Sequence, residues 1–220
     1  VRPAPMGRAF RVLKRTAHLT VRVAERPEKV VAVAAAEAPA RVSHAYRVDA
    51  DGELHVEWDP VIPFAGARLE QRFDLDVAAD GRLYWSDALM AGRGSRGEAW
   101  RFERLSHELR LRVGGSLAYL ERYALTPAGR PVERPWTAGA HRYFATALVH
   151  HADVTPAHAE ALQRALDEGT LRAGVDAIGD RLLLARLAAT AGVPFAAARR
   201  QVRRFAVASI FRRPDLVDRK

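Results

Sequence analysis

Short segments of alternating apolar and polar residues recur through the chain, and their spacing constrains the fold more than any other feature. Segments 41–48 and 54–58 alternate as strands with one buried face do. The tetrapeptide 49–52 between them ends in Asp-Gly, which predicts a hairpin turn. Alternation returns at 67–77 and 117–125, with turns roughly every 8–12 residues, a spacing typical of an all-β sandwich, barrel or solenoid.

The turn at 92–98, Gly-Arg-Gly-Ser-Arg-Gly-Glu, is the most unusual of the series. Its glycines permit positive φ, and its two arginines place fixed charges at one point. It could be a nest that binds an anion through backbone N–H groups. We favour a tight turn between strands in which one arginine forms an ion pair with Glu98 or Asp87. A second extended segment is predicted after it, at 98–104.

The C-terminal region changes character. Residues 143–150 predict a strand, and Thr155-Pro156 then supplies an N-cap followed by proline at the first helical position. A helix is predicted at 157–167. The segment 181–187 predicts a strand, although its length and leucine content also permit a helix. A second helix is predicted to start near Pro194.

These elements predict a mainly β protein with C-terminal helices. The expected organisation is a β-rich body at 1–150 and an α/β portion at 151–220 that packs on it as one structural unit. Large aromatic side chains dominate burial, so the tryptophans are expected in the core or on a sheet face. They are Trp58, Trp85, Trp100 and Trp136.

The composition narrows the function classes. The chain has no cysteine, which excludes a disulfide framework, a thiolate metal site and a cysteine nucleophile. Its formal net charge of +9 is carried almost wholly by arginine, and its sequence contains neither a phosphate-binding P-loop nor a Gly-rich βαβ layout. No run approaches the roughly 18 apolar residues that span a bilayer, and the start lacks a signal-peptide layout. We therefore expect a cytoplasmic protein without a membrane partner.

Two central segments resemble the urease accessory protein D family, called H in some organisms. Segment 57–69 is similar to that family's "LEWLP…I.F.GA.L" segment. Segment 88–98 is similar to its "E-I-x-x-x-GR-x-A-x-GE" segment, and Asp87 stands where the family usually has glutamate. The matching residues of the second segment are Gly92, Arg93, Gly97 and Glu98.

The resemblance extends less strictly toward both ends of the chain. Segment 18–23 resembles the strand that follows the family's glycine-rich "GGD" turn, and Arg186-Leu187 resembles its C-terminal "R-L" ending. The segment 15–17, Arg-Thr-Ala, replaces the glycine-rich turn, and Asp59 replaces a leucine. The chain therefore resembles a divergent, N-terminally abbreviated member of the family.

The resemblance implies a protein without chemistry of its own, built as a solenoid-like body of two stacked sheets with helices alongside. Its partners would be apo-urease on one side and accessory protein F on the other, with the GTPase accessory protein G joining through F. No cofactor would be bound tightly, and nickel would pass through internal channels to the urease active site. The candidate partner or channel residues are Asp87, Arg93, Glu98, Arg199 and Arg203.

A histidine-containing segment is the best candidate for metal binding. His150 and Asp153, with His158 on the following helix, offer the imidazole and carboxylate ligands that suit nickel or zinc. Adjacent histidines on a strand point to opposite faces, so only one of the pair at 150–151 can readily join such a site. The alternative is a solvated end of a strand. The remaining histidines, including His107, are expected to be ordinary strand residues.

Two other function classes remain open. The arginines at 199, 200, 203 and 204 fall largely opposite the apolar stripe of the second predicted helix, where they could bind nucleic acid or an acidic protein groove, or be solvated. Nucleic-acid binding is the first alternative. The pairs Asp74/Asp76 and Glu57/Asp59 each share a strand face, which makes a carboxylate-based hydrolase the second.

Overall fold

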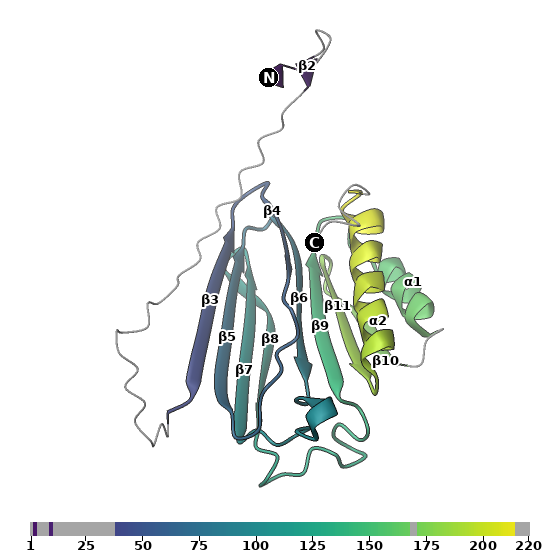
Figure 1. The fold of residues 1–220 in the computed structure, drawn as a ribbon. Helices are drawn as coiled ribbons and strands as arrows, with labels where there is room; N and C mark the ends of the chain where they lie inside the picture. The colour runs from purple at the N-terminus through teal and green to yellow at the C-terminus, as the bar shows by residue number, and fades with distance from the viewer. Residues whose placement is uncertain (1, 4–8, 11–37, 168–170, 214–220) are drawn as a thin grey trace.

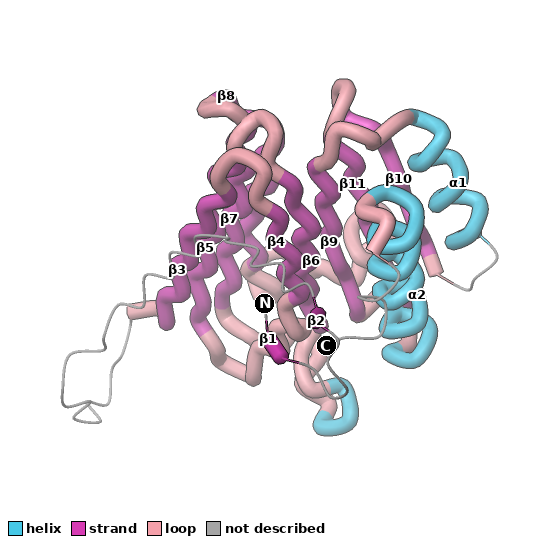
Figure 2. Tube along the Cα trace, turned by 90° about the horizontal axis from the view of Figure 1, so that it is seen from above, coloured by secondary structure: helices cyan, strands magenta, loops and turns pink. Residues whose placement is uncertain are grey.

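The computed structural model describes residues 2–3, 9–10, 38–167 and 171–213 of the 220-residue chain. Two β-sheets face each other, and two helices cover the outer face of one of them (Figures 1 and 2). Two short strands, β1 (Arg2–Pro3) and β2 (Ala9–Phe10), pair with each other separately. The predicted mainly β fold with C-terminal helices is confirmed. The resemblance at 15–23 lies outside the described residues.

The first sheet has four strands in the order β3-β5-β7-β8. Its first three strands run parallel, and β8 pairs with β7 as an antiparallel hairpin. The hairpin turns at Gly114-Gly115, where both residues have the positive φ that glycine adopts without strain. The strands are β3 (Ala40–Val48), β5 (Arg68–Val77), β7 (Arg104–Val113) and β8 (Ser116–Leu125).

The second sheet has five strands in the order β10-β11-β9-β6-β4. Strands β4 and β6 are parallel, whereas the other neighbours are antiparallel. The predicted strands at 143–150 and 181–187 are confirmed as β9 and β11, so the helical alternative for the latter is wrong. The strands are β4 (Glu53–Glu57), β6 (Arg82–Met90), β9 (Tyr143–His150), β10 (Arg172–Ile178) and β11 (Leu182–Ala189).

The chain crosses between the sheets at each step from β3 to β7. The predicted hairpin at 49–52 is therefore wrong: the turn exists, with the Gly52 N–H donating to the Asp49 carbonyl over 3.0 Å, but it joins strands of different sheets. An Asp-Gly turn sets the local backbone, whereas the pairing of the flanking strands depends on partners much later in the chain. The solenoid-like description stays a prediction.

The helices are α1 (Pro156–Asp167) and α2 (Gly192–Phe205), and a π-helical turn, η3 (Ala206–Ile210), extends the second. The predicted starts at Pro156 and near Pro194 are confirmed. Leucines of α1 and the apolar stripe of α2 pack on the outer face of the five-stranded sheet. Among the described residues, neither helix is long and apolar enough to cross a membrane.

Two sequence predictions about the aromatic residues are wrong. The segment after the glycine-arginine turn is not a strand until Arg104: Trp100 has a φ of 59°, and its N–H donates to the Ala91 carbonyl over 2.7 Å. This bend turns Trp100 and Phe102 into the core, so the apolar residues that suggested a strand are buried by a loop. Trp136 is 75 % exposed, because it lies in the loop between β8 and β9 rather than on a sheet.

Candidate functional site

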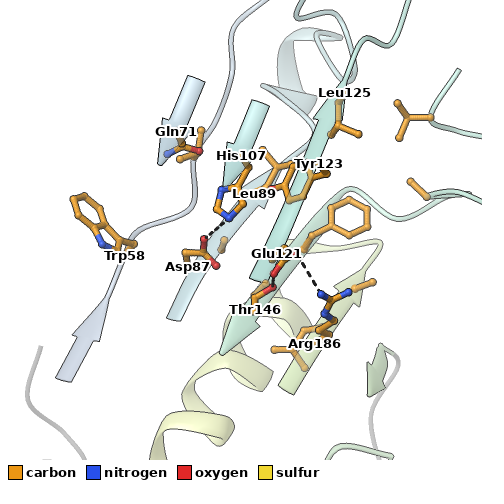
Figure 3. Close-up of a pocket in the computed structure, with 18 of the residues that line it drawn as sticks. Trp58, Gln71, Asp87, Leu89, His107, Glu121, Tyr123, Leu125, Thr146 and Arg186 are labelled. Carbon is orange, nitrogen blue, oxygen red and sulfur yellow. Dashed lines mark hydrogen bonds and ion pairs between the residues drawn. The ribbon is translucent and has the colours of Figure 1, made fainter. Parts of the chain in front are cut away.

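A cavity of about 540 Å³ lies between the two sheets. Apolar side chains from both sheets form much of its wall, among them Phe73, Leu89 and Phe144. A group of polar side chains interrupts this wall, and Figure 3 shows them converging from the two sheets. We call this group the polar cluster. Its members are Asp87, His107, Glu121, Tyr123, Thr146 and Arg186.

Strand alternation places one half of the polar cluster on the five-stranded sheet. On β6 the even-numbered residues pack under the helices, so Asp87 shares the inner face with Trp85 and Leu89. In the strand register Asp87 lies opposite Thr146 of β9, and Thr146 lies opposite Arg186 of β11. The three side chains therefore form a polar row across the inner face of this sheet.

The four-stranded sheet supplies the other half. On β7, His107 occupies an inward position between Leu105 and Leu109, and all three are buried. Its partner in the register of β8 is Tyr123, on which its ring stacks with centroids 4.9 Å apart. Glu121 lies two residues before Tyr123 and so projects from the same face of β8.

Asp87 and His107 meet across the gap between the sheets. The Asp87 Oδ2 lies 3.4 Å from the His107 Nε2 (Figure 3). Burial and, to a smaller extent, the nearby Glu121 carboxylate raise the pKa of Asp87 to about 7, against the opposing charge of Arg199. Burial lowers the pKa of His107. Near neutral pH the pair can thus take up or release a proton while the imidazole stays neutral.

Glu121 is the second carboxylate of the polar cluster, and three groups surround it. The hydroxyls of Thr146 and Tyr119 each donate to its Oε2 over 3.0 Å. The Arg186 Nη2 lies 3.7 Å from its Oε1 and donates to the Tyr119 hydroxyl over 2.7 Å. Burial is the main reason that the pKa of Tyr119 rises to about 12, so this hydroxyl keeps its proton and can donate a hydrogen bond to the Glu121 carboxylate.

The glycine-arginine turn contains the predicted ion pair. Arg93 donates from Nε and Nη2 to the two carboxylate oxygens of Glu98, over 2.6 and 2.5 Å. Its guanidinium also lies 4.3 Å from the centroid of the Phe64 ring. Gly92 has a φ of 134°, and a Cβ there would lie 2.4 Å from the Glu98 carbonyl oxygen. Asp87 does not join this pair, because it lies between the sheets.

The basic stripe of the second helix is not as open as the sequence predicts. Arg199 is only 8 % exposed and donates to the Trp58 carbonyl over 2.7 Å. Its Nη2 also lies 3.5 Å from Glu57, and the Arg203 Nη1 lies 3.3 Å from the same carboxylate. Helical periodicity predicts that these arginines lie on a polar face of the helix, but in the structure this face packs against the Glu57 carboxylate of β4. Arg199 and Arg203 therefore attach α2 to β4.

Comparison of the whole sequence with known families decides what kind of protein this is. A family model described as "UreD urease accessory protein" matches residues 15–220. The chain belongs to the UreD urease accessory protein family.

Relatives named "Urease accessory protein UreD" agree with this assignment. The chain is 34 % identical to the Xanthobacter autotrophicus protein over 146 residues, which are 65 % of this chain and 50 % of the relative. It is 34 % identical to a Methylobacterium protein over 144 residues, which are 62 % of this chain and 51 % of that relative. Identity reaches 43 % with the Sorangium cellulosum protein over 81 residues, 37 % of this chain and 26 % of the relative. The chain thus spans about half or less of these curated relatives.

The segments that carry the resemblance to UreD proteins lie around the cavity. Trp58, Asp59 and Val61 from the first motif line it, as does Asp87 at the start of the second. Arg186 and Leu187 of the C-terminal motif line it as well. Residues that are distant in the sequence are therefore gathered at one site.

The predicted metal ligands are not brought together. The His150 ring is buried and its Nδ1 contacts the Gly81 carbonyl over 2.8 Å, whereas Asp153 pairs with Arg212. The His158 Nδ1 accepts a hydrogen bond from the Thr155 N–H. Across the described part of the chain, no three histidine, aspartate or glutamate side chains are grouped so that they could hold a metal ion.

Sequence reasoning missed two central residues of the cavity. His107 was expected to be an ordinary strand residue, and Glu121 was not singled out. Both stand at apolar positions of alternating strands, His107 among inward leucines and Glu121 between Tyr119 and Tyr123. An ionisable residue at an inward position is the pattern that could have identified them.

Proposed function

We propose that this protein acts in urease maturation, as a scaffold that holds apo-urease together with accessory protein F and helps nickel reach the urease active site. Accessory protein G would join through accessory protein F. Membership of the UreD family supports the role in maturation, and the curated relatives carry the same name. On this proposal the protein is a chaperone that performs no catalysis itself.

The observation that carries the nickel part is the polar cluster inside the cavity. Carboxylate and imidazole groups are suitable ligands for a divalent transition metal. Asp87 and His107 lie 3.4 Å apart, so a small shift of either side chain would let both bind one ion. Two protein ligands plus water hold an ion weakly, which suits a cargo that must be released. Nickel would then displace the proton of Asp87 as it binds.

The glycine-arginine turn supports the scaffold part. The Arg93–Glu98 pair and the stacked Phe64, which is 56 % exposed, present a fixed surface at one end of the body. An ordered surface with an exposed aromatic side chain is typical of protein interfaces. We therefore assign this end to partner binding, whereas Arg199 and Arg203 serve inside the protein.

Co-expression and affinity purification test the scaffold. The tagged chain is produced with the urease subunits and accessory proteins F and G, and the recovered proteins are identified by mass spectrometry. We expect apo-urease and accessory protein F with the natural chain, and less of at least one of them with Arg93→Ala. The Arg96→Ala variant, in the same turn, is the matched control. Recovery of the chain without either partner would contradict the proposal.

A carboxylate-based hydrolase is the second candidate, because two of the three carboxyl residues that line the cavity, Asp87 and Glu121, project between the sheets in different surroundings. Family membership favours the maturation role. One member of each pair that first suggested hydrolysis is engaged outside the cavity, since Asp74 pairs with Arg72 and Glu57 with two arginines. Turnover of a glycoside or ester panel that is lost in Asp87→Asn would favour the hydrolase.

A further inference from the structure

Arg186 brings a positive charge to the Glu121 carboxylate of the cavity from a partly exposed position. Its side chain is 54 % exposed, whereas that of Glu121 is 14 % exposed. Arg186 lies on the inner face of β11, but the facing sheet ends at β8, so its outer part stays in contact with solvent. One end of this ion pair is therefore fixed inside the protein, whereas the other end reaches solvent and is also bound by a hydrogen bond to the Tyr119 hydroxyl.

The contacts of Glu121 are divided between its two oxygens. Oε2 accepts hydrogen bonds from Thr146 and Tyr119, which fix the carboxylate in place. The ion pair of Arg186 is with Oε1, at 3.7 Å (Figure 3). Withdrawal of Arg186 would thus leave the carboxylate oriented, with one oxygen available inside the cavity.

There is also room beside Arg186 for its side chain to move. The residue opposite Arg186 in the register of β10 is Gly174, which also lines the cavity. A Cβ placed on Gly174 would meet no atom within 4 Å. An ion pair with one exposed member is weak, so moving the arginine into solvent costs little beyond the hydrogen bond that it donates to the Tyr119 hydroxyl.

We propose that Arg186 is a displaceable counter-cation, which occupies Glu121 while the cavity is empty and gives way to a divalent cation. This inference rests on the proposed function, in which Ni²⁺ passes through the cavity. Because guanidinium and metal ion compete for the same carboxylate oxygen, Arg186 weakens the binding of the metal and favours its release. Arginine stays charged at any accessible pH, so this competition does not depend on its protonation.

Calorimetric titration of Ni²⁺ into the full chain tests this role. Arg186→Met keeps the length of the side chain but removes its charge, and should tighten Ni²⁺ binding by roughly fivefold, the upper range for a partly exposed ion pair. Arg186→Lys keeps the charge and should bind Ni²⁺ as the natural chain does. The control is Arg122→Met, which removes an arginine of β8 that pairs with Glu108 outside the polar cluster.

Repeating the Arg186→Met substitution in the Glu121→Gln variant tests whether the change in Ni²⁺ affinity depends on Glu121. In Glu121→Gln the side chain for which Arg186 and the metal compete has lost its negative charge. Arg186→Met should therefore no longer tighten Ni²⁺ binding in this variant. Unchanged or weaker Ni²⁺ binding by Arg186→Met would overturn the inference, as would a gain that persists with Glu121→Gln. Absence of Ni²⁺ binding in every variant would overturn both the inference and the nickel part of the proposed function. Recovery of urease partners in the purification above tests the scaffold part separately.

Discussion

Replacement of Asp87 by asparagine should change stability in a way that depends strongly on pH. Burial raises the pKa of this carboxyl from 3.8 in the unfolded chain to about 7 in the folded protein. The folded state therefore keeps a proton that the unfolded state releases between these two values. The destabilisation of the folded protein by this group therefore begins near pH 3.8, increases as the pH rises, and levels off above pH 7. Asparagine carries no such cost.

The magnitude follows from the two pKa values. Each pKa unit corresponds to about 1.4 kcal/mol, and the linkage between pH 5 and pH 8 amounts to about 3 kcal/mol. The free energy of unfolding of Asp87→Asn, relative to that of the natural chain, should therefore rise by about this amount from pH 5 to pH 8. Burial lowers the pKa of His107, so His107 contributes with the opposite sign in both proteins.

Urea denaturation followed by circular dichroism at pH 5 and pH 8 measures this difference. Asp74→Asn, at a carboxylate that pairs with Arg72 away from the cavity, is the control and should show no comparable rise. A gap between Asp87→Asn and the natural chain that stays constant or shrinks toward pH 8 would refute the reasoning. It would mean that Asp87 is ionised in the folded protein throughout this range.

Two further substitutions test contacts outside the cavity. Gly92→Ala should destabilise the protein by at least about 2 kcal/mol in urea denaturation, because of its positive φ and the approach of the Glu98 carbonyl, whereas Gly94→Ala meets open space and should be nearly neutral. Arg199→Met should cost about 2 kcal/mol in the same assay, since it leaves the Trp58 carbonyl without its buried donor and removes one of the two arginines that pair with Glu57. The exposed Arg200→Met should not. Equal effects within either pair would contradict the contacts described above.

The sequence predicted most strands but not the sheets to which they belong. Alternation records which residues of a segment are buried, and this local property located the strands at 41–48 and 143–150. Sheet membership depends on pairing, and the parallel partners of β3 and β4 come two strands later in the chain. A turn such as 49–52 looks the same whether it closes a hairpin or carries the chain to the opposite sheet.

In the candidate site, contacts within one segment could be predicted from the sequence, whereas contacts between distant segments could not. Asp87 was identified through a motif, but its neighbour His107 comes from the other sheet and meets it only in the folded protein. Arg199 was placed on a polar helix face because periodicity contains no information about Glu57, which lies on β4. The Arg93–Glu98 pair was predictable, since both residues belong to one short turn.

The nickel content of urease purified from co-expressing cells tests the central claim most directly. The urease subunits and accessory proteins F and G are produced with the natural chain, Glu121→Gln or the control Asp74→Asn, and nickel per active site is measured by mass spectrometry. The account predicts normal nickel with Asp74→Asn and several-fold less with Glu121→Gln, while the same partners are still recovered with the chain. Full nickel loading with Glu121→Gln would contradict passage through the cavity, and full loading in cells that lack the chain would contradict the role in maturation.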